Sequence, residues 1–258
     1  GKRRVEKKDS GIILSIKDVS KSFPGVKALD NVSIDIARGI VHGIVGENGA
    51  GKSTLMKILS GVYTKDTGTV VFDGETIEHT TPIESLNRGL SIIYQEFNLV
   101  NTMSVGENIF LGRFAEMHGM RGTHAEARKL LDSIGCSIDT HTLVGDLSAA
   151  EKQMVEITKA LSFQSKLIIM DEPSSSLTSD ELKQLFLIIH DLKARGVSII
   201  YISHKLDEIF ELCDIVTVMR DGHVIDTKPV GELTRAEMIT KMVGRSIEHE
   251  YPERPRCV

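Results

Sequence analysis

Apolar and polar residues alternate in the first part of the chain and give way to short apolar runs further along. The alternation in IILSIKDVSKSF (12–23) and NVSIDIA (31–37) predicts two strands, the first of them at a sheet edge. IVHGIV (40–45) is almost continuously apolar, which is typical of a parallel strand buried on both faces. Later runs predict three more buried strands: LSIIYQ (90–95), KLIIM (166–170) and VSIIYIS (197–203).

Turn and cap residues complete this pattern. GTVVFDGETI (68–77) and DIVTVMRDGHVI (214–225) each carry an Asp-Gly pair between apolar stretches, which predicts two β-hairpins. Capping boxes, in which a Ser or Thr is followed three residues later by Glu, predict helix starts at Ser148 with Glu151, Thr123 with Glu126 and Thr178 with Glu181. Residues from about 97 to 160 are predominantly helical and separate two groups of strands. The pattern therefore predicts a mixed α/β core interrupted by a helical subdomain.

Composition and charge indicate the class of protein and its cellular location. The 258 residues are 41% hydrophobic and 26% charged, as in ordinary globular proteins. The net charge is −5, but residues 1–10 carry +3, so we expect a solvated basic tail, with contact to anionic lipid or nucleic acid as the alternative. The acidic remainder argues against a nucleic-acid binder. Three cysteines without metal-ligand spacing, and neither a signal peptide nor an apolar run long enough to span a bilayer, indicate a cytoplasmic protein whose membrane role needs a partner.

GENGAGKST (46–54) lies between the apolar run and a helical pattern and matches G-x-x-x-x-G-K-[ST]. Its glycines let backbone N–H groups turn toward an anion, and the helix start adds the positive end of its dipole. Lys52 supplies an ammonium group to the β- and γ-phosphates, Ser53 a hydroxyl to Mg²⁺, and Thr54 a hydroxyl to a neighbouring phosphate. A chance match would lack the flanking strand and helix, so we expect nucleotide binding. The predicted contacts are Gly46, Glu47, Asn48, Gly49, Ala50, Gly51, Lys52, Ser53 and Thr54.

Two adjacent carboxylates end the strand KLIIM. A buried carboxylate is unfavourable without a cation, so Asp171 is the expected ligand of the nucleotide's Mg²⁺. Glu172, where the strand ends, can turn toward the γ-phosphate and polarise a water molecule as the general base. The alternatives are a helix-capping carboxylate for Asp171 and a surface carboxylate for Glu172.

Polar residues also end two other predicted strands. Gln95 follows LSIIY and His204 follows VSIIYIS, and an open α/β sheet binds its ligand at the carboxyl ends of its strands. Gln95 could hold the metal or the attacking water, and His204 could contact the γ-phosphate. Each signal is weak alone, since a lone His is more often structural. Because the chain also carries the 46–54 loop and the two carboxylates, a functional interpretation of Gln95 and His204 is favoured.

Taken together, these motifs resemble the nucleotide-binding domain of ATP-binding cassette (ABC) transporters over a domain of residues 11–245. The matching segments are GENGAGKST (P-loop), YQE (Q-loop), LSAAEKQ (signature), LIIMDEP (Walker B), SSLT (D-loop) and SHK (switch histidine). The resemblance implies a P-loop NTPase (RecA-like) core with an antiparallel β-subdomain and an inserted α-helical subdomain, and an ATPase that uses Mg²⁺. It also implies that adenine stacks on Phe23, although a Phe taken alone is more often a core residue.

Several segments are similar to the ATPases of bacterial sugar importers of the ribose, galactose and xylose type: KSFPGVKALDNV, GVYTKDTGTV, QMVEITKALS and EPSSSLT. Those ATPases usually fuse two cassettes, which implies that this chain is a first cassette and that residues 246–258 begin a linker to a second. The implied partners are that second cassette, arranged head to tail, the transmembrane permease subunits and, indirectly, a periplasmic or extracellular sugar-binding protein. The implied location is the cytoplasmic face of the membrane.

The signature segment has a second implied role. In the family, its Ser and the helix behind it bind the γ-phosphate of ATP held by the opposite cassette, so Ser148 would be both an N-cap and a donor across a dimer interface. The segment departs from the common LSGGQ, because Ala149 and Ala150 place methyl groups where phosphates approach, and Thr178 stands where Asp is common. The sequence leaves open how well this cassette completes the opposite site.

Two other functions compete with a sugar-importer ATPase. One is a soluble ABC ATPase that acts on ribosomes or DNA, against which the acidic body counts. The other is a small-molecule P-loop kinase, for which no acceptor site is evident. A kinase would also leave the signature and the switch histidine unexplained, and the similarity of the motifs to those of importers counts against the soluble ATPase, so transport is favoured.

Overall fold

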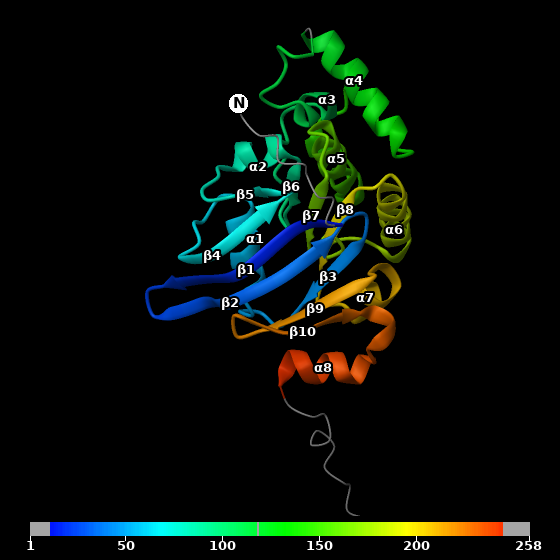
Figure 1. Cartoon of the computed structure of the whole chain (residues 1–258). Helices are drawn as coiled ribbons and strands as arrows, with labels where there is room; N and C mark the ends of the chain where they lie inside the picture. The colour runs from blue at the N-terminus through cyan, green and yellow to red at the C-terminus, as the bar shows by residue number, and fades with distance from the viewer. Residues whose placement is uncertain (1–10, 118, 245–258) are drawn as a thin grey trace, which may run out of the picture.

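The computed structural model describes residues 11–117 and 119–244, so the predicted basic tail (1–10) and linker (246–258) lie outside the described residues. Within them the chain forms two β-sheets with helices packed on and between them (Figure 1). The strands are β1 (Ile12–Phe23), β2 (Val26–Ala37), β3 (Val41–Val45), β4 (Thr67–Phe72), β5 (Glu75–Thr76), β6 (Leu90–Ile93), β7 (Leu167–Asp171), β8 (Ser198–Ile202), β9 (Ile215–Arg220) and β10 (His223–Pro229). The helices are α1 (Lys52–Leu59), α2 (Pro82–Arg88), α3 (Val105–Ile109), α4 (Met120–Ser133), α5 (Ala149–Ser162), α6 (Ser179–Ala194), α7 (Leu206–Leu212) and α8 (Arg235–Val243), with 3-10 turns η1 (Val144–Asp146) and η2 (Val230–Glu232).

The larger sheet has six strands in the order β10-β9-β3-β8-β7-β6. The strands from β9 to β6 pair in parallel, and β10 pairs antiparallel with β9. Every residue of β3 and β8 is buried, which confirms the prediction from their continuous apolar runs. The carboxyl ends of the parallel strands therefore meet along one edge of the sheet, where a ligand can bind.

The smaller sheet is antiparallel, in the order β2-β1-β4-β5. The prediction that 12–23 is an edge strand is wrong, because β1 lies between β2 and β4. Alternation along a strand reports that one face of the sheet is buried, and it carries no information about which strands pair on either side. Both predicted hairpins, β4–β5 and β9–β10, are confirmed, and Asp73-Gly74 and Asp221-Gly222 have the positive φ that such turns require.

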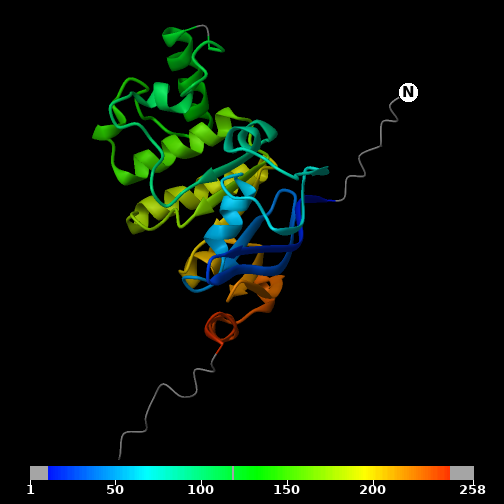
Figure 2. The same ribbon diagram turned by 90° about the vertical axis from the view of Figure 1, so that its left-hand side faces the viewer.

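Helix α1 lies between the two sheets (Figure 2). Leu55, Met56 and Leu59 of α1 belong to one core with residues of β1, β2, β7 and β8. The opposite face of the six-stranded sheet is covered by residues of α5, α6, α7 and α8 in a second core. Residues of β3 and α1 are buried in these cores, so the loop between them begins and ends at packed elements.

Helices α3, α4 and α5 form the inserted helical part, with a small core of their own. The capping boxes at Ser148 and Thr178 are confirmed at the starts of α5 and α6. The one at Thr123 is wrong: α4 begins at Met120, and the Thr123 hydroxyl donates to the carbonyl oxygen of Gly119 within the helix, 3.0 Å away. Across residues 11–117 and 119–244, no helix has the length and apolarity that crossing a bilayer demands.

The buried His42 of β3 makes folding stability pH-dependent. Its Nε2 lies 2.8 Å from Oγ1 of Thr217, its Nδ1 has no partner, and burial lowers its pKa from 6.5 to about 4. Below pH 6.5 His42 becomes protonated in the unfolded chain but stays neutral in the folded chain until the pH approaches 4. The contribution of neutral His42 to folding stability is therefore fully present above pH 6.5 and is lost as the pH falls toward 4. We expect this residue to remove about 3 kcal/mol of the free energy of unfolding across that window.

Urea unfolding at a series of pH values measures this effect, with His42→Gln as the comparison, because a Gln side chain can still bond Thr217 but does not titrate. The difference between the two proteins should change by about 3 kcal/mol between pH 7 and pH 4. A difference that stays constant with pH would show that His42 has the same pKa in the folded and unfolded states, which would contradict the lowering by burial.

Candidate nucleotide site

The loop from Gly46 to Gly51 joins β3 to α1 and is shaped by its glycines. Gly51 caps α1 with φ 100° and without a side-chain hydrogen bond, so the N–H groups of the first helical turn point into the loop. A Cβ on Gly46 would lie 2.3 Å from the carbonyl oxygen of Met219, and one on Gly51 would lie 2.7 Å from that of Ala28. Only glycine fits at these positions, and the result is a cradle of N–H donors at the positive end of a helix.

A substitution in this cradle should disrupt it. Gly46→Ala must push the loop away from Met219, because a contact of 2.3 Å with a backbone oxygen cannot be relieved by a side-chain rotation. We expect the free energy of unfolding to fall by about 2 kcal/mol, the usual cost of overpacking, and nucleotide affinity to fall with it.

Gly231→Ala is the matched control, since a Cβ at Gly231 would meet no atom within 4 Å. Urea unfolding and ATP titration of both variants make the comparison. Equal behaviour of the two variants would contradict the close packing of the loop on β9.

Lys52 is the first residue of α1 and is only 8% exposed. Its Nζ donates to the carbonyl oxygens of Gly46, at 2.7 Å, and Glu47, at 3.0 Å. Burial lowers the pKa of Lys52, and the charges of Glu172 and Asp171 oppose that shift. The ammonium group of Lys52 is therefore bonded to neutral carbonyl oxygens at the mouth of the cradle. It can exchange these acceptors for the oxygens of a bound phosphate.

One cavity, of about 520 Å³, lies along the outer side of the loop. Phe23 lines it with residues 48–54, and its ring packs edge-on against Tyr63 with centroids 5.2 Å apart. The adenine contact at Phe23 stays a prediction. Val26, opposite Phe23 in the β1–β2 register, also lines it, although its place there was not predicted. Further lining residues that sequence analysis missed are Lys27, Ala28 and Asp221.

A second cavity, of about 500 Å³, brings together Ser53, Gln95 and Asp171. These side chains offer a hydroxyl, an amide carbonyl and a carboxylate, the oxygen donors that Mg²⁺ prefers. Burial raises the pKa of Asp171, Glu172 raises it further, and Lys52 and Lys57 act in the opposite sense. A divalent cation would offset both unfavourable effects on Asp171, so this donor set fits the metal that the sequence predicts.

A third cavity, of about 650 Å³, contains Glu172, His204 and Gln95 beside residues 46–48 of the loop. Nδ1 of His204 lies 2.7 Å from Oε2 of Glu172. Glu172 has φ 49°, a strained value for a residue with a side chain, and its N–H donates to the carbonyl oxygen of Ile202 at 3.0 Å. The turn at the end of β7 thus aims Glu172 at the loop instead of leaving it on the surface. Met242 of α8 also lines this cavity and was not predicted.

Ser148 is placed differently from the other predicted residues. It is exposed at the start of α5, where its Oγ accepts from the N–H of Glu151 at 3.2 Å, and it lines none of the three cavities described around the loop. Its helix is joined to the segment after Gln95, because buried Glu156 accepts from the N–H of Asn98 at 2.7 Å. Ser148 therefore lies apart from the residues that the structure brings together around the 46–54 loop.

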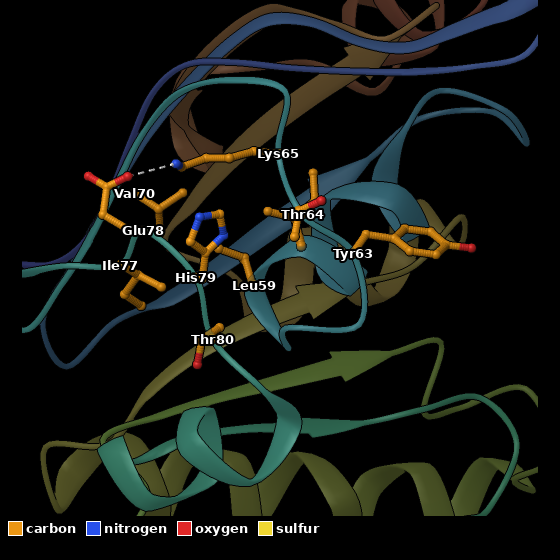
Figure 3. Close-up of a pocket in the computed structure, with 10 residues that line it drawn as sticks. Leu59, Tyr63, Thr64, Lys65, Val70, Ile77, Glu78, His79 and Thr80 are labelled. Atoms are coloured by element: carbon orange, nitrogen blue, oxygen red, sulfur yellow. Dashed lines mark ion pairs between the residues drawn. The ribbon is translucent and has the colours of Figure 1, made fainter.

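A fourth cavity lies under the small sheet, between α1 and the β4–β5 hairpin (Figure 3). It has a volume of about 20 Å³, which is room for about one water molecule. Lys65 and Glu78 form an ion pair of 3.6 Å at its edge. It is too small for a nucleotide and shares no residue with the 46–54 loop.

Comparison with known proteins agrees with this geometry. The model of the family described as ABC transporter matches residues 29–175. The chain belongs to the ABC transporter family. A structure of the ADP conformation of an ATP-binding cassette of an ABC transporter is 29% identical, with a TM-score of 0.77 over 90% of this chain and 97% of that one. The predicted P-loop NTPase fold, with an antiparallel sheet and a helical insertion, is thereby confirmed.

Two curated ABC relatives are similar along most of the chain. The putative ribose/galactose/methyl galactoside import ATP-binding protein of Geobacillus kaustophilus is 51% identical over 93% of this chain and 48% of its own length. A protein of Agrobacterium fabrum named putative ribose/galactose/methyl galactoside import ATP-binding protein 1 is 48% identical over 95% of this chain and 49% of its own length. The chain spans about half the length of these relatives.

Proposed function

We propose that this chain is the ATP-binding and ATP-hydrolysing cassette that powers import of a sugar through a membrane ABC transporter. The observation that carries the proposal is that Gln95, Asp171, Glu172 and His204 converge from three separate segments on the 46–54 loop, which carries Lys52. The printed names of the relatives, which are sugar import ATP-binding proteins, support the choice of a sugar as cargo.

The residues divide the work of phosphoryl transfer. Lys52 and the N–H groups of the loop bind the β- and γ-phosphates, and Phe23 stacks on adenine. Ser53, Gln95 and Asp171 would hold Mg²⁺, which neutralises charge on the β- and γ-phosphates when bound. Glu172 accepts a proton from the attacking water, whose oxygen bonds to the γ-phosphorus as the bond to the β-phosphate oxygen breaks.

His204 and Ser148 complete the site from two sides. His204, paired with Glu172 at 2.7 Å, fixes that carboxylate and reaches toward the γ-phosphate. Ser148, exposed at the start of α5, would donate to the γ-phosphate held by a second cassette arranged head to tail. The further partners of the proposal are transmembrane permease subunits and, through them, a sugar-binding protein outside the membrane, which would hold the chain at the cytoplasmic face.

Phosphate release from Mg·ATP at a series of chain concentrations tests the proposal. If two copies complete each other's sites, the rate should rise with the square of the chain concentration while pairing is limiting. Transfer of the γ-phosphate to a small molecule instead of water would indicate a kinase. Recovery with ribosomes, and not with an integral membrane subunit, would favour the ABC ATPase that acts on ribosomes or DNA.

A further inference from the structure

Behind Glu172 and His204 lies a buried carboxylate that belongs to none of the three cavities. Glu208 of α7 is only 3% exposed. It accepts hydrogen bonds from the hydroxyls of Ser174, at 2.6 and 2.8 Å, Tyr201, at 2.8 Å, and Ser203, at 3.0 Å. Nζ of Lys205 lies 3.2 Å from its Oε1. A charge buried so deeply needs such partners, and here three hydroxyls and one cation supply them.

The partners of Glu208 come from the two loops that carry the proposed catalytic pair. Ser174 follows Glu172 by two residues, and Ser203 directly precedes His204. Lys205 joins the same loops, since its Nζ also donates to the carbonyl oxygen of Ser174 at 3.2 Å and its N–H to the hydroxyl of Ser203 at 3.0 Å. One carboxylate on α7, the helix that directly follows the second loop, therefore bonds to both loops.

We propose that Glu208 is a positioning residue, which holds Ser174 and Ser203 and thereby sets Glu172 and His204 in register beside the 46–54 loop. This inference rests on the proposed function, because it assigns Glu208 to the reaction that Glu172 performs. Glu172 has a strained φ, and a strained conformation persists only where its surroundings fix it. Glu208 supplies that fixation through side chains, in addition to two backbone bonds: the N–H of Glu172 donates to Ile202, and the carbonyl oxygen of Glu172 accepts from the N–H of Ser175.

A carboxylate with a purely structural role would contribute to folding stability alone, whereas a positioning residue also affects turnover. The variant Glu208→Gln distinguishes these two roles. The Gln side chain keeps the volume but replaces one of the two acceptor oxygens with an NH₂ donor, so it can no longer accept from all the hydroxyls that bond Glu208. We expect kcat to fall by about tenfold to a hundredfold, because small displacements of catalytic groups have effects of that size. The KM for ATP should stay unchanged, since Glu208 contacts none of the loop residues 46–54.

Two controls separate the loop anchors from other changes. Tyr201→Phe removes the donor that lies on β8 and leaves both loop serines bonded, so kcat should change less than twofold. Glu211→Gln removes an exposed carboxylate from the same helix and should have no effect. Ser174→Ala and Ser203→Ala should each show part of the decrease in kcat. Glu208→Asp, which keeps a carboxylate, should retain a higher kcat than Glu208→Gln.

Amide hydrogen exchange tests the same inference without turnover. In Glu208→Gln the amides of Glu172 and Lys205 should exchange at least about tenfold faster, while those of α1 keep their wild-type rates. Exchange that is unchanged at Glu172 and Lys205, or a uniform acceleration across the chain, would overturn the inference. A wild-type chain and permease complex that release no phosphate would instead overturn the proposed function, and the exchange result would stand separately.

Discussion

Replacing Glu172 by Gln should stop ATP turnover and leave ATP binding intact. The amide has nearly the same size and can still meet His204, but it cannot accept a proton from water. General-base catalysis contributes about 10²- to 10⁴-fold to reactions of this kind, so we expect kcat to fall by at least about 100-fold. Phosphate release measures turnover, and calorimetric titration with Mg·ATP measures binding.

The control for this experiment is Glu232→Gln, which removes an exposed carboxylate on η2 far from the cradle in sequence. It should hydrolyse ATP at the wild-type rate. Unchanged turnover in Glu172→Gln would remove Glu172 as the base, even if the 46–54 loop binds ATP as proposed.

Replacing Lys52 by Ala should have the second large effect, on binding itself. The ammonium group is buried at the mouth of the cradle and donates to the carbonyl oxygens of Gly46 and Glu47. Hydrogen bonds to charged groups contribute about 1.5–3 kcal/mol each, so losing the bond to phosphate should weaken ATP binding about 10- to 100-fold. Titration with Mg·ATP at fixed ionic strength measures this loss.

Lys183→Ala serves as the control for Lys52→Ala, because Lys183 lies on the exposed face of α6 with 74% of its side chain accessible. Its affinity for ATP should equal that of the wild type. Wild-type affinity in Lys52→Ala would mean that the triphosphate is bound away from the cradle.

The predictable parts of the site are those whose functional residues are adjacent in the sequence or directly follow an apolar run. Residues 46–54 form one motif between a strand and a helix, and Asp171-Glu172, Gln95 and His204 each end a recognisable apolar run. Because parallel strands end at one edge of a sheet, the rule that places ligands there was enough to bring these residues together.

The parts that were missed depend on contacts between distant segments. Val26 and Asp221 reach the outer cavity only through a hairpin register and through the packing of the β9–β10 turn against β2. In SHKLDEIF, Glu208 looks like any polar residue on a short helix, and its burial becomes visible only once α7 is packed on β8. Thr123 shows the reverse case, in which a correct local pattern was overridden because the helix begins one turn earlier.

A crystal structure of the Glu172→Gln chain with ATP and Mg²⁺ is the most direct test of the central claim, that the 46–54 loop is the nucleotide site. The account predicts the β- and γ-phosphates within hydrogen-bonding distance of the N–H groups of residues 49–52 and of Lys52, with adenine on the ring of Phe23. A triphosphate bound elsewhere on the chain, with Lys52 still bonded to the carbonyl oxygens of Gly46 and Glu47, would contradict it.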